Sequence, residues 1–139
     1  MSFMESMNLV GLPIVTFFQG DNRFNFILDT GSNRSIIDKN ILPMLKHSEV
    51  IYNKDNSLLG MDGINHNPGV CAISFYYKEK EYFYDGYLVQ DMSGVFKSIK
   101  EDSGVTLHGL LGAQFFNKFK YVLDFNKLIA YSEGGRGNK

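Results

Sequence analysis

The sequence Phe26-Ile27-Leu28-Asp29-Thr30-Gly31-Ser32 is the most informative part of this chain. Its first three residues form an apolar run typical of a buried strand, and an acid and a Gly-containing turn follow directly. Turns at strand ends are where a rigid scaffold holds a reactive side chain toward a cleft. Asp29 is therefore the leading candidate for a functional carboxylate, and Asp-Thr-Gly occurs once in the chain.

Length and composition predict one compact, β-rich domain. The chain has 139 residues, a usual size for one domain, and its 12 Phe and 8 Tyr favour pleated strands over helices. We expect the domain to span residues 1–132, with a flexible glycine-rich tail at 133–139. The formal net charge of -1 predicts neither nucleic acid nor an anionic membrane as a partner.

Cofactor chemistry finds no support in the sequence. Cys71 is the only cysteine and sits in an apolar, strand-like run, so it is expected to be a small core residue. His47, His66 and His108 have no metal-ligand spacing and are expected on the surface or in loops. We predict no metal and no cofactor. With neither a signal peptide nor a transmembrane segment, a cytoplasmic protein is the default expectation, and a preceding leader stays open.

The elements around Asp29 are expected to be strands and turns. Residues 8–19 predict a strand, and the turn Gly20-Asp21-Asn22 hands over to a second strand at 23–28. A short strand at 35–37 follows, and then Asp38 caps a short helix over 39–46. Further predicted strands cover 50–52, 57–59, 69–77 and 81–90, with a hairpin over 121–125 and 128–131.

The remaining segments predict one loop and one helix. Residues 93–107 carry apolar residues at mixed spacing and predict a loop with a short helical turn. Leu110, Leu111 and Gly112 form an apolar pair closed by a glycine. A helix over 113–119 follows, with its Phe side chains on one face.

In their order and spacing, these motifs resemble the retropepsin-like, single-lobe aspartic protease family over roughly residues 8–132. The resemblance implies an all-β fold, a closed or partly open β-barrel with one short C-terminal helix and a flap hairpin. In that family the apolar-apolar-Gly element lies across the active-site loop. The flap and substrate-binding residues that it implies are Gly60, Met61, Asp62, Gly63 and Ile64.

Aspartic catalysis uses two carboxylates that share one proton, one acting as base toward a water and the other as acid toward the scissile carbonyl. Neither Asp62, Asp91 nor Asp124 stands in a second Asp-Thr-Gly setting. The second Asp29 must then come from another copy of the chain, because a twofold axis brings identical residues together. The resemblance thus implies a homodimeric aspartic endopeptidase acting on extended peptides or proteins.

The residues after Asp29 receive supporting roles from the same resemblance. Thr30 would hydrogen-bond across the dimer axis, Gly31 would allow close backbone approach, and Ser32 would donate to the Asp29 carboxylate. Three residues are candidates for lining the substrate cleft. Ile64 lies in the predicted flap, and Val105 or Leu107 lies ahead of the Leu-Leu-Gly turn.

Three other interpretations stay open. Asp29 can be a plain turn cap, because Asp often accepts a hydrogen bond from the backbone two residues on. The domain can be a catalytically silent protease fold used for dimerisation or peptide binding, because fold does not fix function. A strand ending in Asp-Thr-Gly-Ser also resembles the phosphate loop of actin and sugar kinases, although the chain is too short for two lobes.

Overall fold

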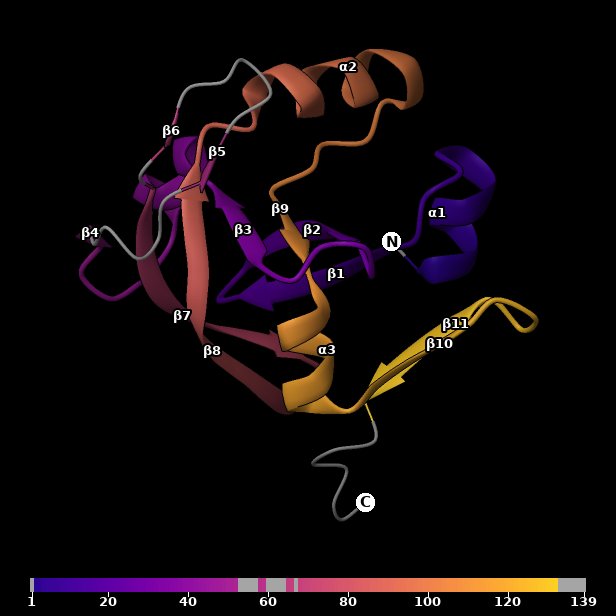
Figure 1. Cartoon of the computed structure of the whole chain (residues 1–139). Coiled ribbons are helices and arrows are strands. Elements are labelled where there is room, and N and C mark those ends of the chain that lie inside the picture. The colour runs from indigo at the N-terminus through magenta and orange to yellow at the C-terminus, as the bar shows by residue number, and fades with distance from the viewer. Residues whose placement is uncertain (1, 53–57, 60–64, 67, 133–139) are drawn as a thin grey trace.

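Six strands of the computed structural model close into a β-barrel (Figure 1). The structure describes residues 2–52, 58, 59, 65, 66 and 68–132. Strands follow the order β1-β2-β9-β3-β8-β7, and the pair Phe18 and Tyr76 joins β7 back to β1. The elements are α1 (Phe3–Leu9), β1 (Ile14–Gln19), β2 (Asn22–Leu28), β3 (Ser35–Asp38), η1 (Lys39–Met44), β4 (Ile51–Tyr52), β5 (Leu58–Leu59), β6 (Asn65–His66), β7 (Gly69–Tyr77), β8 (Lys80–Gln90), α2 (Ser93–Ser103), β9 (Gly109–Leu111), α3 (Ala113–Phe119), β10 (Tyr121–Asp124) and β11 (Ile129–Ser132).

The short strand β9 lies between β2 and β3, which are consecutive in sequence. It runs parallel to β2, with Leu28 opposite Leu111, and antiparallel to β3, with Ile36 opposite Leu110. Gly109 makes this fit, because a Cβ there would lie 2.7 Å from the backbone oxygen of Ile36. The loop from β2 to β3, which carries Asp29, must therefore pass over the end of β9.

Aromatic side chains fill the barrel. Alternating residues of β1, β2 and β7 point inward and bury Phe17, Phe24, Phe26 and Phe75 almost completely. Helix α3 closes one side of this core with Phe115 and Phe119 on its inner face. Full burial of such a side chain stabilises the fold by about 1.5–3 kcal/mol. The predicted all-β barrel and the predicted α3 are both confirmed.

The C-terminal hairpin stands apart from the barrel sheet. Strands β10 and β11 pair only with each other among the described residues, and they project from the end of α3 (Figure 1). The ring of Phe125 at the tip meets Phe3 of α1 edge-on, with ring centroids 5.3 Å apart. This contact ties the hairpin to the N-terminal helix.

The predicted strand over 8–19 is wrong in its first half, where α1 ends at Leu9 and a turn leads to β1. Ser2 and Glu5 form a capping box that begins α1, and Gly11, with φ +79°, turns the chain before β1 begins at Ile14. A helix of seven residues is too short to be stable in isolation, so α1 depends on its packing against the rest of the domain. The buried Ser6 hydroxyl accepts a hydrogen bond from the Ile14 N–H at 3.0 Å and fixes α1 to β1.

The predicted loop over 93–107 is also wrong, because α2 occupies eleven of these residues. Gly104 ends the helix in the left-handed conformation, with φ +81°. Phe96 is buried in a second apolar cluster with Ile14, Val105 and Leu107, outside the barrel. Most residues of α2 are exposed, so the sequence has too few apolar residues at helical spacing to predict this helix. The expectation of one short helix thus undercounted the helices.

The segment after β3 is helical as predicted, but shorter and tighter. Asp38 caps it by accepting the Asn40 N–H at 3.2 Å, and a 3₁₀ helix ends at Met44 with Pro43 inside. No helix among the described residues combines the length and the apolar character needed to cross a membrane.

Candidate active site

Asp29 lies where β2 ends, and its backbone is fixed by β9. The Asp29 N–H donates to the Leu111 carbonyl at 2.9 Å, and the Asp29 carbonyl accepts the Ser32 N–H at 3.2 Å. On the other side of β2, the Leu28 N–H donates to the Pro13 carbonyl at 2.8 Å. The start of the loop is therefore held from two directions.

The Asp29 carboxylate is half-buried, and the loop beyond it faces outward. Its Oδ1 accepts the Gly31 N–H at 3.0 Å, which is the bond of an Asx turn. No second hydrogen bond to this carboxylate occurs within the described residues. Thr30 and Gly31 are exposed. The turn thus orients one carboxylate oxygen, and the other makes no hydrogen bond within the described residues.

Leu110, Leu111 and Gly112 cross directly behind this loop. The Ala113 N–H donates to the Ser32 carbonyl at 2.7 Å, and the Gln114 N–H donates to the Asn33 carbonyl at 3.2 Å. These are two of the donors that a helix leaves unpaired in its first turn. The loop therefore caps α3, and α3 in return fixes the loop. The structure brings together the two motifs that the sequence singled out.

Gly112 is required by the closeness of this crossing. A Cβ there would lie 2.5 Å from the Arg34 carbonyl oxygen and 2.6 Å from that of Ser32. The Gly112 N–H donates to the hydroxyl of Ser35, which is completely buried, at 3.0 Å. Sequence reasoning missed Ser35 because a serine at the start of a short strand carries no signal of its own. Gly31 is less crowded than Gly112. A Cβ added at Gly31 would contact only Asp29 Oδ1, at 3.4 Å, among the surrounding described atoms.

Ser32 differs from its expected role. Its hydroxyl donates to the Arg34 carbonyl at 2.8 Å, so its proton is directed away from the Asp29 carboxylate. The short loop curls back on itself, and the nearest acceptor for this hydroxyl is backbone. Ser32 therefore stiffens the loop.

The proposed cleft residues Val105 and Leu107 are buried beneath α2 and are not exposed to a substrate in this chain. The predicted flap residues 60–64 lie outside the described residues. Strands β5 and β6, which flank them, pair antiparallel, with Leu58 opposite His66 and Leu59 opposite Asn65. The described residues on either side of the predicted flap are thus paired with each other.

His108 lies in the loop before β9, which agrees with the expected surface or loop position, and its side chain is partly buried. Its Nδ1 accepts the Asn25 N–H at 2.9 Å, and its ring lies edge-on to Phe24. Burial lowers the pKa of His108, the Asp38 carboxylate opposes this effect, and Lys100 adds to it. His108 thereby anchors the chain just before β9. The described part of the chain holds no group of three or more His, Cys, Asp or Glu side chains placed to share a metal ion.

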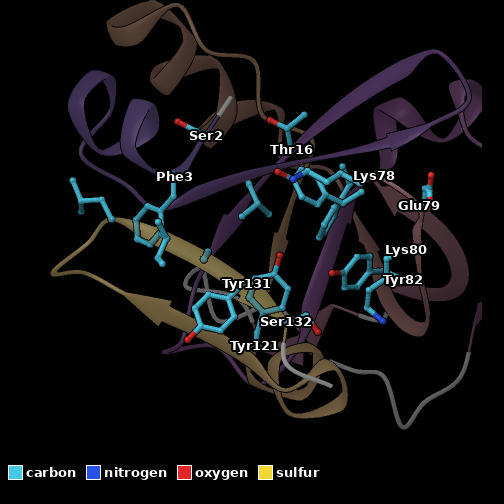
Figure 2. A pocket seen from close by; sticks show the side chains of 16 residues that line it. Ser2, Phe3, Thr16, Lys78, Glu79, Lys80, Tyr82, Tyr121, Tyr131 and Ser132 are labelled. Atoms are coloured by element: carbon cyan, nitrogen blue, oxygen red, sulfur yellow. The ribbon is translucent and has the colours of Figure 1, made fainter. Parts of the chain in front are cut away.

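A cavity of about 850 Å³ lies away from the Asp29 loop, between β1, the turn from β7 to β8, and the β10–β11 hairpin (Figure 2). Rings of Tyr82, Tyr121 and Tyr131 line it, and Lys78 and Lys80 stand on the side of the β7–β8 turn. Burial raises the pKa of both Tyr82 and Tyr121. None of the predicted site residues lines this cavity.

A scan against models of known protein families finds no match to this chain, and a search of curated proteins likewise finds none. The arrangement around Asp29 therefore carries the functional argument alone.

Proposed function

We propose that this chain is one subunit of a homodimeric, retropepsin-like aspartic endopeptidase. The observation that carries the proposal is the passage of β9 between β2 and β3, which clamps the Asp29 loop against Gly112 and α3. A loop held at both ends can keep a carboxylate within the fraction of an ångström that catalysis needs.

The chemistry assigns Asp29 and a second Asp29 to the activation of water. Two carboxylates held close together cannot both ionise easily, so the pair shares one proton at moderately acid pH. The ionised member takes a proton from water while the protonated member donates to the scissile carbonyl oxygen. The pair titrates as a unit.

Other aspartates are engaged in local structure. Asp124 Oδ1 accepts the N–H groups of Asn126 and Lys127 in the β10–β11 turn, at 2.9 and 3.0 Å. Hydrogen bonds from the Ser93 side chain, from the Ser93 N–H at 2.9 Å and from Asn40 lower the pKa of Asp91 to about 2. Neither lies in the Asp29 loop, which supports a second copy of the chain as the source of the second carboxylate.

Apolar surface beside the loop supports association. A twofold axis that pairs the two Asp29 side chains passes close to the loop, so the elements flanking it enter the interface. Helix α1 and the β10–β11 hairpin project on the same side of the barrel (Figure 1), and the residue before β1, Pro13, is bonded to Leu28 beside Asp29. The exposed apolar residues of these two elements are Met4, Leu9, Phe125, Ile129 and Tyr131.

Mixing subunits tests the proposal sharply. Asp29→Asn keeps the side chain's acceptor for the Gly31 N–H but removes the acid, so the variant should fold, dimerise and fail to cleave peptides. If each active site needs both carboxylates, an equal mixture with wild type should retain about a quarter of the activity, because mixed dimers are also inactive. A site within one chain would retain about half.

The matched control is Asp102→Asn, which removes an exposed acid from α2 and should cleave as wild type does. Sedimentation at low and high protein concentration reports the dimer independently of activity. Cleavage by a strictly monomeric chain, or equal cleavage by Asp29→Asn, would refute the mechanism.

The second candidate is a catalytically silent protease fold that dimerises or binds peptides. The Asx turn favours it, because Asp29 already has a structural partner in Gly31. Under this alternative, Asp29→Asn binds peptides as wild type does and neither protein cleaves them.

A further inference from the structure

Arg34 ends the Asp29 loop, and its backbone is fixed. Its carbonyl oxygen accepts the Ser32 hydroxyl at 2.8 Å and packs against Gly112, where an added Cβ would lie 2.5 Å away. The base of this side chain is therefore as rigid as the loop itself, five residues after Asp29.

The guanidinium of Arg34 has no carboxylate partner within the described chain. Its Nε is buried and makes no hydrogen bond, and no ion pair of Arg34 occurs among the described residues, although the side chain is partly exposed. A guanidinium offers five donors in a planar fork that matches a carboxylate, and an unpaired buried donor is costly. Such a group is suited to an acceptor supplied from outside.

Arg34 lies near Tyr84 of β8 and the first turn of α3. Burial raises the pKa of Tyr84, and the positive charge of Arg34 opposes this effect, which places Arg34 near the Tyr84 hydroxyl. That hydroxyl contacts Gln114 Oε1 at 3.3 Å, in the first turn of α3. Lys118 Nζ lies 5.8 Å from the Tyr84 ring, and Asp85 follows Tyr84 on β8. A second cation therefore lies near the same tyrosine as Arg34.

We propose that Arg34 binds a carboxylate of the peptide substrate and selects acidic side chains near the scissile bond. This inference rests on the proposed protease function and adds a substrate class to it. An extended peptide advances about 3.3 Å per residue, so an arginine at the end of the loop reaches side chains roughly two to four residues from the cleaved bond. In a twofold dimer one Arg34 lies on each side, so the preference should appear at equal offsets in both directions.

Paired peptides that differ only as Glu or Gln at these positions test the inference. For wild type we expect kcat/KM to be roughly 10- to 100-fold higher with Glu at pH 6. Arg34→Gln should bring this ratio near one, and Arg34→Glu should invert it, so that the Gln peptide is cleaved faster than the Glu peptide. The wild-type preference should fall away near pH 3.5, because the substrate Glu protonates around pH 4.3.

A measurement of peptide affinity tests the role of Arg34 independently of peptide cleavage. Fluorescence anisotropy with the Asp29→Asn protein measures the affinity ratio for the same Glu and Gln peptides whether or not the wild type cleaves. A ratio near one there overturns the role of Arg34, while loss of all cleavage with the Glu preference kept overturns only the protease. If Arg34→Gln instead dissociates the dimer and leaves the ratio unchanged, the carboxylate belongs to the second copy and the inference is wrong. Arg34→Lys, which keeps the charge, should retain part of the preference and controls for folding.

Discussion

Replacing Gly112 with alanine should loosen the Asp29 loop and destabilise the whole domain. The new Cβ would lie 2.5 and 2.6 Å from the carbonyl oxygens of Arg34 and Ser32, about 1 Å closer than ordinary contact. Both atoms belong to backbone, so no side chain can rotate away. Overpacking of this kind costs about 1–3 kcal/mol.

Hydrogen bonds at the crossing add to this cost. The bonds from Gly112 N–H to Ser35 Oγ and from Ala113 N–H to Ser32 O, at 3.0 and 2.7 Å, must both stretch when the loop moves. With about 1 kcal/mol at stake in each, we expect Gly112→Ala to lower the free energy of unfolding by about 2–4 kcal/mol. For a domain of this size the Tm falls by roughly 6–16 °C. A displacement of about 1 Å at Asp29 should also lower cleavage about 100-fold.

Gly94→Ala is the matched control, because an added Cβ there meets nothing within 4 Å and the position is helical. It should stabilise the protein by up to about 1 kcal/mol. Urea unfolding at one fixed protein concentration measures both variants, since dimerisation makes stability depend on concentration. If Gly112→Ala lies within about 0.5 kcal/mol of wild type, the crossing is looser than its distances indicate and the argument for a rigid loop fails.

Three further outcomes follow from buried groups. Ser35→Ala leaves the Gly112 N–H without its acceptor, so urea unfolding should show a loss of about 1–3 kcal/mol, and an unchanged midpoint would contradict this. Because burial lowers the pKa of His108 and its Nδ1 must stay unprotonated to accept the Asn25 N–H, its stabilising effect is present above pH 6.5 and lost below it. Wild type should therefore lose more stability than His108→Gln between pH 7.5 and 5.5, and parallel losses would refute the role of His108. Burial raises the pKa of Cys71 to about 11, so a disulfide reagent at pH 8 should label it only after unfolding, and rapid labelling of native protein would show the core to be open there.

Regular elements with strong local patterns were predictable. The alternation in β7 and β8, the turn between β1 and β2, and the phenylalanine face of α3 all matched the structure. Helices α1 and α2 were missed because both are short and depend on tertiary contacts, through Ser6 with Ile14 and Phe96 with Leu107.

Some residues of the candidate site were also predictable from the sequence, and others were not. Asp29 and Gly112 were found because their residue types are unusual at the ends of apolar runs. The partners of Ser32 and Ser35 were not found, because a hydroxyl donates to or accepts from whichever group the folded chain brings near. Val105 and Leu107 were misplaced for the same reason, since α2 covers them.

Strand alternation, turn chemistry and residue type act over a few neighbouring residues, so the sequence alone was enough to predict a β-rich domain with one Asp-Thr-Gly turn after an apolar strand. The passage of β9 between β2 and β3, and the lack of a carboxylate partner for Arg34 within the described chain, follow from tertiary contacts. The bonds that fix this arrangement join residues 77 and 83 positions apart, Ser35 with Gly112 and Asn25 with His108. Contacts over such distances form only when the barrel closes, so no local pattern records them.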